Sequence, residues 1–339
     1  MLRSRIAGTG SYLPARRVTN EEVSPHLRLG PEAVCRRTGI RARHWAEEGQ
    51  ATSGLAEEAA RRACEAAGLS PSSIEAVIVS TTSPDLGLPS TACLLQRNLK
   101  AAKAAAFDLS ASCSGFLYGL SAADRLIRSG RFRQCLVVAA EIKSRFLNLQ
   151  DDATAILFGD GAGAAVVVGE QVEGDHAAGI MGIHLSAEGA RHDLIAVPAG
   201  GSRRPATAQT VRARLHTIHM RGGPLFRLAV HRLAAAVTDL LKEHGLRLED
   251  VSQAVFHQAN GRLLASLGRR LGLPREKLYS TIETTGNTSS ASLPIALDRA
   301  VREGRLHDGD LVLLGTFGGG LTWAAALIRW RNGAAGPAA

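Results

Sequence analysis

Cys113 is the residue whose surroundings most favour chemistry. It lies in the segment FDLSASCSGFLYGL, where a short apolar strand is expected at 107–109 and apolar residues recur at helical spacing from Phe116 onward. The cysteine therefore falls at a strand-to-helix turn, where unpaired N–H groups and the helix dipole stabilise a thiolate. We expect a lowered thiol pKa and nucleophilic chemistry. A buried structural cysteine is the alternative that the local sequence leaves open.

Two polar side chains in the second half of the chain are further candidates. His257, in AVFHQANGRLL, ends an apolar run expected to be a strand at 254–257, and α/β proteins place their sites beyond strand ends. Asn287, in TTGNTSSASLP, puts a side-chain amide in a turn before a helix. The glycines after Phe317 let backbone N–H groups approach a ligand closely. A structural histidine, an ordinary polar turn and a flexible bulge are the respective alternatives.

The elements that must position these residues alternate between strands and helices, which predicts an α/β fold. Residues 52–67 are expected to form a helix capped by Thr52 or Ser53, and residues 74–80 a strand. Apolar residues at helical spacing predict a second long helix at 223–244.

Two pairs of segments repeat in the same order along the chain. AGLSPSSIEAVIVS matches HGLRLEDVSQAVFH at a spacing of 177 residues, and ADRLIRSGR matches LDRAVREGR. Two ordered echoes predict an internal duplication. The predicted division is a first half at 1–172 that carries the cysteine, a second half at 173–332 that carries the histidine and asparagine, and a flexible tail at 333–339.

Composition excludes several classes of protein. The 339 residues contain no apolar run long enough to span a membrane, and no secretory signal is expected at the N-terminus. The five cysteines include no CxxC pair, which disfavours a zinc site or disulfide framework and predicts a reducing, cytoplasmic location. The net charge is +9, but aromatic residues make up only 4% and no long basic run occurs, so nucleic-acid binding is weakly supported, and an acidic protein partner explains the charge equally well.

Five motifs together resemble one family. DLSASCSGF, FGDGAGAAV, HQANGRL, GNTSSASLP and FGGGLTW stand in the order and spacing of the ketosynthase III (beta-ketoacyl-[acyl-carrier-protein] synthase III) family, over nearly the full chain. The resemblance implies a thiolase-like fold, a five-layered αβαβα sandwich of two duplicated halves, working as a homodimer. FGDGAGAAVVV is expected to run into a strand, so its glycines do not make a dinucleotide site.

The resemblance also implies a mechanism. Cys113, His257 and Asn287 fall on the family's catalytic triad, and the backbone N–H groups of Cys113 and Gly320 would form the oxyanion hole. Cys113 would take an acyl group from a thioester, and a malonyl group on acyl carrier protein would lose carbon dioxide and attack it, to begin a fatty acid or polyketide. No metal or redox cofactor is implied. The last cysteine is Cys135, which argues against a degradative thiolase with its second, late cysteine.

The resemblance implies a basic surface that docks the acidic carrier protein. Its residues here are Arg37, Arg227, Arg262, Arg269 and Arg270.

The chain departs from the family at the coenzyme A site. Ala33 replaces a clamping Trp, Asp152 replaces its Arg partner, and Gly223 replaces an Asn that contacts the pantetheine arm. These changes favour a carrier-bound acyl donor, or coenzyme A held differently. Leu88 stands where the family uses a residue of the partner subunit to limit acyl length. Two alternatives stay open: acyl transfer to an alcohol or amine without condensation, and a non-catalytic binding role.

Overall fold

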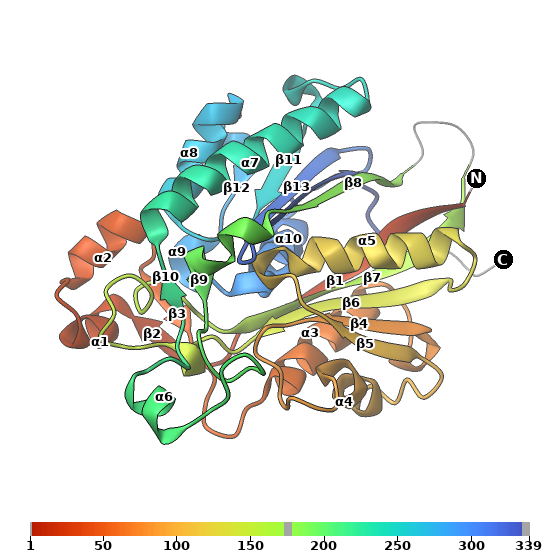
Figure 1. Cartoon of the computed structure of the whole chain (residues 1–339). Coiled ribbons are helices and arrows are strands. Elements are labelled where there is room, and N and C mark those ends of the chain that lie inside the picture. Colours follow the sequence, from red (N-terminus) through yellow and green to blue (C-terminus); the bar gives the residue numbers. More distant parts are fainter. Residues whose placement is uncertain (1, 173–177, 334–339) are drawn as a thin grey trace.

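The protein is a five-layered αβαβα sandwich, as a computed structural model of the chain shows (Figure 1). The structure describes residues 2–172 and 178–333. Two five-stranded sheets lie between three layers of helices (Figure 1). The expectation of a thiolase-like α/β sandwich is confirmed.

The first sheet has the strand order β1-β7-β6-β4-β5. Its strands are β1 (Leu2–Tyr12), β4 (Ala76–Ser80), β5 (Ala105–Leu109), β6 (Gln134–Glu141) and β7 (Gly161–Gln171). Strand β4 runs parallel to β5 and β6, and β7 runs antiparallel to both β6 and β1. The glycine-rich segment at 158–168 enters β7 rather than a helix, as predicted.

The second sheet repeats this arrangement. Its strands are β8 (Gly179–Ala187), β11 (Gln253–Phe256), β12 (Leu278–Tyr279), β13 (Leu311–Gly318) and β14 (Thr322–Arg329). The order β8-β14-β13-β11-β12 matches the first sheet strand for strand, with the same parallel and antiparallel neighbours. The duplication is therefore present in the topology. The join near residue 172 stays a prediction, because residues 173–177 lie outside the described part of the chain.

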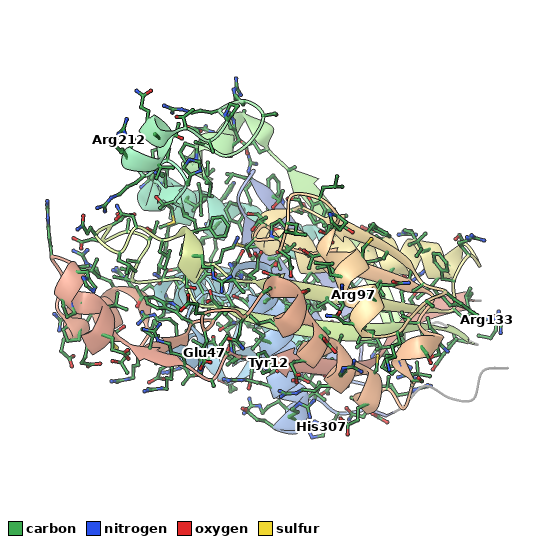
Figure 2. The ribbon with its side chains drawn as sticks, turned by 90° about the horizontal axis from the view of Figure 1, so that it is seen from below. Tyr12, Glu47, Arg97, Arg133, Arg212 and His307 are labelled. Atoms are coloured by element: carbon green, nitrogen blue, oxygen red, sulfur yellow. The ribbon has the colours of Figure 1, made fainter. Side chains whose placement is uncertain are left out.

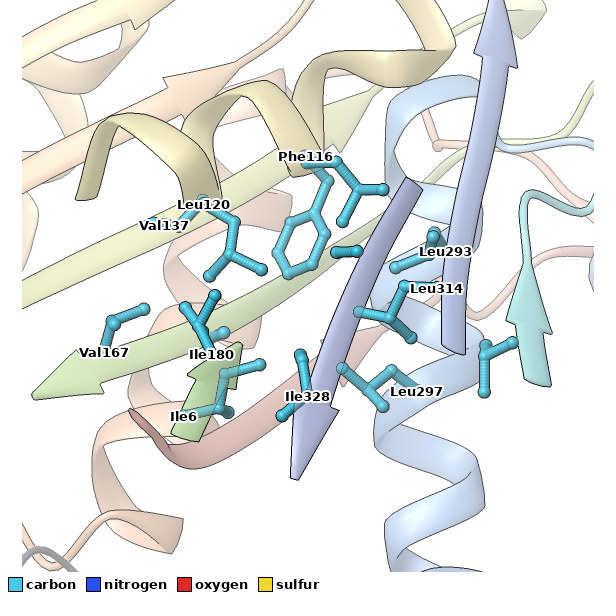
Figure 3. Close-up of a cluster of buried hydrophobic side chains, with 14 of the residues drawn as sticks. Ile6, Phe116, Leu120, Val137, Val167, Ile180, Leu293, Leu297, Leu314 and Ile328 are labelled. Atoms are coloured by element: carbon cyan, nitrogen blue, oxygen red, sulfur yellow. The ribbon is translucent and has the colours of Figure 1, made fainter. Parts of the chain in front are cut away.

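Helices α5 (Gly115–Arg128) and α10 (Ser292–Arg302) form the central layer between the sheets. Phe116 and Leu120 of α5 and Leu293 and Leu297 of α10 pack with strand residues such as Leu314 in one buried cluster (Figure 3). Burial of each such side chain stabilises the fold by roughly 1.5–3 kcal/mol. Because this layer joins the halves, the loops that lead into α5 and α10 are held against each other.

The outer layers cover the remaining sheet faces. Helices α3 (Thr52–Ala66) and α4 (Thr91–Asn98) pack on the first sheet, and α7 (Gly222–Glu243) and α8 (Gly261–Leu271) on the second (Figure 1). The predicted helices at 52–67 and 223–244 are confirmed. The expected cap of the first is wrong: Ala51 is the N-cap residue, and the Asp85 carboxylate accepts the N–H of Ser53 at 3.0 Å.

Shorter elements lie around the sandwich. They are α1 (Asn20–Val23), α2 (Pro31–Thr38), α6 (Ala208–Arg212), α9 (Ile282–Thr285), the pair β2 (Arg17–Thr19) and β3 (Ala42–His44), and the pair β9 (Ile195–Ala196) and β10 (His219–Met220). Seen from below, Arg212 of α6 and Arg133 lie at opposite ends of the molecule (Figure 2).

No helix among the described residues is both long and apolar enough to cross a membrane, and these residues hold no cluster of three or more potential metal ligands. The predicted tail at 333–339 lies outside the described part of the chain, except for Gly333.

Candidate active site

Cys113 lies between β5 and α5, in a short 3-10 turn over Ser112–Ser114. Gly115 is the first residue of α5. Glycine is required there because a Cβ would lie 1.8 Å from the hydroxyl oxygen of Ser80. Strand β14 holds the turn in place: Thr322 donates its hydroxyl to the carbonyl of Ala111 at 2.9 Å. Cys113 is 7% exposed and lines a cavity of about 590 Å³. The predicted strand-to-helix position is therefore confirmed, with the sulfur facing a space that a ligand can enter.

The glycine run after Phe317 passes directly over Cys113. A Cβ on Gly318 would lie 2.6 Å from the backbone nitrogen of Cys113, and one on Gly319 would lie 3.0 Å from the Ser112 hydroxyl oxygen. Gly318 and Gly319 line the cavity, whereas Gly320 does not. The assignment of Gly320 to the oxyanion hole stays a prediction, and Gly319 is the alternative that the cavity lining favours.

His257 follows β11 and is fixed through its backbone, which donates to the carbonyl of Gly315 at 2.8 Å. The ring is 5% exposed and lines the same cavity as Cys113. Burial lowers the pKa of His257 to about 3, so the imidazole is neutral at physiological pH. Its Nδ1 is buried and has no hydrogen-bond partner among the described residues. A neutral imidazole protonated at Nε2 is a hydrogen-bond donor without positive charge.

Asn287 is oriented by the turn that contains it. Its side-chain Oδ1 accepts the N–H of Ser289 at 2.9 Å, and its own N–H donates to the carbonyl of Leu157 at 2.9 Å. With Oδ1 occupied inside the turn, Nδ2 is the amide atom left for a ligand. Asn287 is 6% exposed and lines the cavity. The fold thus brings Cys113 of the first half to one cavity with His257 and Asn287 of the second.

The thiol does not have the electrostatics expected from its helix position alone. Burial raises the pKa of Cys113, and the hydrogen bond with Ser289 opposes that rise. The expectation of a lowered pKa is therefore not met, because desolvation penalises the thiolate.

Two buried polar residues beside the thiol, Ser289 and Glu141, were not identified from the sequence. The Ser289 hydroxyl oxygen lies 3.4 Å from Cys113 Sγ and donates to Glu141 Oε1 at 3.2 Å. Glu141 is fully buried and pairs with Lys143, whose Nζ lies 3.0 Å from Oε2. Although burial acts to raise it, the pKa of Glu141 lies below its usual value, because Lys143 and the hydroxyl donors together outweigh the effect of burial. The pattern E-x-K at the end of an apolar strand was the available signal.

The predicted basic residues divide into two sets. Arg37, Arg227 and Arg262 line the cavity. Arg269 and Arg270 lie in the last turn of α8, outside the lining, where Arg270 contacts the Nδ1 of His231 at 3.2 Å. All five are exposed.

The residues that depart from the family lie at different places. Asp152 and Gly223 line the cavity, and Asp152 accepts the N–H of Arg28 at 3.0 Å. Ala33 is half-buried on α2 and does not line it. Leu88 is 86% exposed and does not line the cavity of its own chain.

Comparison with known proteins gives a consistent result. A family model described as 3-oxoacyl-[acyl-carrier-protein] synthase III matches residues 107–189, and its C-terminal counterpart matches residues 241–330. The beta-ketoacyl-[acyl-carrier-protein] synthase III of Caldanaerobacter subterraneus is 46% identical over 96% of this chain and 97% of its own length. The chain belongs to the beta-ketoacyl-[acyl-carrier-protein] synthase III family. Members of this family are acyltransferases, and so is this chain.

Solved structures of beta-ketoacyl-[acyl-carrier-protein] synthase III proteins have the same fold. The 3-oxoacyl-[acyl-carrier-protein] synthase III of Aquifex aeolicus is 39% identical, with a TM-score of 0.87 over 96% of this chain and 100% of that one. The priming beta-ketosynthase of the R1128 polyketide biosynthetic pathway is 37% identical, with a TM-score of 0.88 over 96% of each chain. This chain is therefore about as similar to a priming ketosynthase of a polyketide pathway as to the Aquifex aeolicus synthase III.

Proposed function

We propose that this synthase III condenses a Cys113-bound acyl group with malonyl-acyl carrier protein and releases carbon dioxide and a β-ketoacyl product, to begin a fatty acid or polyketide. The observation that carries the proposal is the convergence of one thiol and two uncharged hydrogen-bond donors, His257 and Asn287, on one cavity. Neutral donors suit a reaction in which negative charge develops on an oxygen.

In the first half-reaction, Cys113 attacks the carbonyl carbon of an acyl thioester. A tetrahedral oxyanion forms, the bond to the departing sulfur breaks, and the proton of the Cys113 thiol ends on that departing thiolate. The backbone N–H groups of Cys113 and Gly319 are the proposed donors to the oxyanion. Gly318 is the last residue of β13 and pairs with Thr322, so Gly319 offers the first N–H beyond the strand ladder.

In the second half-reaction, malonyl-acyl carrier protein enters the same cavity. Its carboxylate leaves as carbon dioxide, and the electron pair passes to the thioester carbonyl as an enolate. His257 Nε2 and Asn287 Nδ2 donate to the enolate oxygen, each worth on the order of 10²–10³ in rate by analogy with oxyanion holes. The enolate carbon then attacks the Cys113 thioester and frees the thiolate. The scheme draws its carbanion from loss of carbon dioxide, so it uses neither a metal nor a redox cofactor.

The proposed carrier-protein surface surrounds the mouth of the cavity. Arg37, Arg227 and Arg262 are exposed and line it, and Arg269 and Arg270 extend the basic surface along α8. An acidic carrier protein would be steered to this surface, and its phosphopantetheine arm would reach Cys113 through the cavity. Asp152 adds a negative charge to the lining, which supports a carrier-bound acyl donor over coenzyme A.

The proposed working form is a cytoplasmic homodimer. Strand β5 is an edge of the first sheet and exposes Phe107 at 38%, and the segment between β4 and α4 exposes Leu86 at 52% and Leu88 at 86%. An unpaired edge with exposed apolar residues favours pairing with a second copy. In such a dimer, Leu88 is proposed to enter the partner's cavity and limit the length of the acyl chain.

Measured release of carbon dioxide tests the proposal. Purified protein is loaded with an acyl donor and then given malonyl-acyl carrier protein. Release of carbon dioxide together with a β-ketoacyl-carrier product supports condensation. Transfer of the acyl group to an added alcohol or amine, with no carbon dioxide released, would establish the alternative acyltransferase. Activity that survives Cys113→Ala unchanged would indicate a non-catalytic role for this thiol.

A further inference from the structure

We propose that Ser289 is a further catalytic residue. Its hydroxyl donates its hydrogen bond either to Glu141 or to the sulfur of Cys113, and the buried Glu141–Lys143 pair controls which acceptor it serves. The proposal deepens the proposed function, because it rests on Cys113 as the nucleophile. It concerns how a buried thiol ionises in a cavity where the neighbouring histidine is neutral.

Ser289 is held beside the sulfur in an unusual backbone conformation. Its φ is +53°, in the left-handed region that non-glycine residues rarely adopt, and Asn287 Oδ1 fixes its N–H at 2.9 Å. Such strain persists where surrounding structure enforces it and is concentrated at functional sites. The result is a hydroxyl oxygen 3.4 Å from Cys113 Sγ and 3.2 Å from Glu141 Oε1.

The internal duplication shows how the two halves diverged at this point. Ser289 lies 177 residues after Ser112, and the two have φ values of +53° and +51° in matching 3-10 turns. At the same spacing, Gly318 ends β13 where Glu141 ends β6. Gly318 lets the backbone pass close to Cys113, whereas at the equivalent position the Glu141 side chain reaches the serine turn.

A serine hydroxyl has one hydrogen and can serve one acceptor at a time. When it donates to Glu141, its oxygen is free to accept the Cys113 S–H, and the thiol stays protonated. When the hydrogen turns to the sulfur, it stabilises the thiolate. The proton lost by the thiol passes to the departing thiolate of the acyl donor, so the step adds no other reactant. After acylation the sulfur is uncharged, and the hydrogen returns to Glu141.

Glu141 loses little when Ser289 turns away. It still accepts from Ser83 at 2.6 Å, Ser290 at 2.8 Å and the N–H of Thr82 at 3.1 Å, and it keeps its ion pair with Lys143. Lys143 also donates to the Thr82 hydroxyl and lies 5.7 Å from the Phe146 ring centre. The charged groups that bear on the thiol are thus Glu141, which disfavours the thiolate, and Lys143, which favours it, while His257 in the same cavity is neutral.

The test is the pH dependence of Cys113 alkylation by iodoacetamide, followed on the Cys113 peptide by mass spectrometry. Ser289→Ala is expected to raise the midpoint by about one unit or more, so that alkylation below it slows roughly tenfold, because a charge-assisted hydrogen bond is lost. Ser290→Ala is the matched control: it removes a neighbouring donor to the same Glu141 oxygen, and it should move the midpoint much less than Ser289→Ala does.

The ion pair provides a second measurement that does not depend on Ser289→Ala folding. Lys143→Met should raise the midpoint and Glu141→Gln should lower it, because the two charges act on the thiolate with opposite sign. A purely structural pair would move both midpoints in one direction. Equal midpoints for Ser289→Ala and Ser290→Ala, or shifts of the same sign for the ion-pair variants, overturn the inference. Failure of wild-type Cys113 to accept any acyl group would instead overturn the proposed function.

Discussion

Replacing Gly318 with alanine probes the closest contact in the site. The new Cβ would lie 2.6 Å from the backbone nitrogen of Cys113 and 3.1 Å from its Cα and Cβ. Ordinary contacts begin near 3.4 Å, so the two segments must separate by about 0.8 Å. The neighbour is backbone rather than the end of a flexible side chain, so it is the nucleophile itself that moves.

The expected cost has two parts. Overpacking of this kind destabilises a protein by about 1–3 kcal/mol. A displacement of about 1 Å at the reacting atoms costs on the order of 100-fold in rate. We therefore expect Gly318→Ala to fold with a lowered Tm, and to acylate Cys113 on the order of 100-fold more slowly.

The assay measures the rate of Cys113 acylation by intact-protein mass spectrometry, with Tm measured in parallel. Gly54→Ala is the control: Gly54 is exposed on α3, and a Cβ there meets nothing within 4 Å. It should leave the acylation rate unchanged and raise stability by about 0.5–1 kcal/mol, as alanine favours helix. Acylation of Gly318→Ala at the wild-type rate would show that the glycine run does not constrain the nucleophile.

Three further predictions concern the other parts of the site. Asn287→Asp keeps Oδ1 for the Ser289 N–H but replaces the Nδ2 donor with an anionic acceptor. Release of carbon dioxide should therefore fall roughly 10²–10³-fold, while Cys113 is still acylated. Equal loss of acylation and of carbon dioxide release would contradict the assigned role. Arg262→Glu should raise the KM for malonyl-acyl carrier protein with little change in kcat, and this effect should weaken at high salt; an unchanged KM would remove Arg262 from the carrier surface. Burial lowers the pKa of His257 to about 3 in the folded protein, whereas the unfolded value is about 6.5. The contribution of the neutral ring to the free energy of unfolding is therefore full above pH 6.5 and is lost as pH falls toward 3. The Tm of His257→Gln should depend less on pH over that range than the Tm of the wild type, and parallel Tm profiles would count against a buried neutral ring.

Local patterns predicted the elements that carry the reactive residues. The small residues around Cys113 and the helical spacing after it identified a strand-to-helix turn, because both signals act over a few neighbouring positions. The repeated segments at a spacing of 177 predicted two halves, and the matching strand orders confirm the duplication. The same spacing relates Ser112 to Ser289, two residues whose pairing would have been hard to notice without the backbone angles.

Contacts between the halves could not be predicted in this way. Three consecutive glycines do not indicate which two line the cavity, whereas the structure places Gly318 and Gly319 there. The Glu141 contact with Ser289 joins residues 148 positions apart, through the packing of α10 against the first sheet. The direction of the Cys113 pKa shift also depends on how fully the fold buries the sulfur, whereas the helix position alone favours the opposite sign.

The most direct test of the account is intact-mass analysis before and after each half-reaction. A suitable acyl donor should add one acyl mass, which peptide mapping should place on Cys113. Malonyl-acyl carrier protein should then remove that mass with release of one carbon dioxide for each β-ketoacyl-carrier product formed. An adduct on any other residue, or an acyl-Cys113 that malonyl-acyl carrier protein leaves intact, would contradict the account.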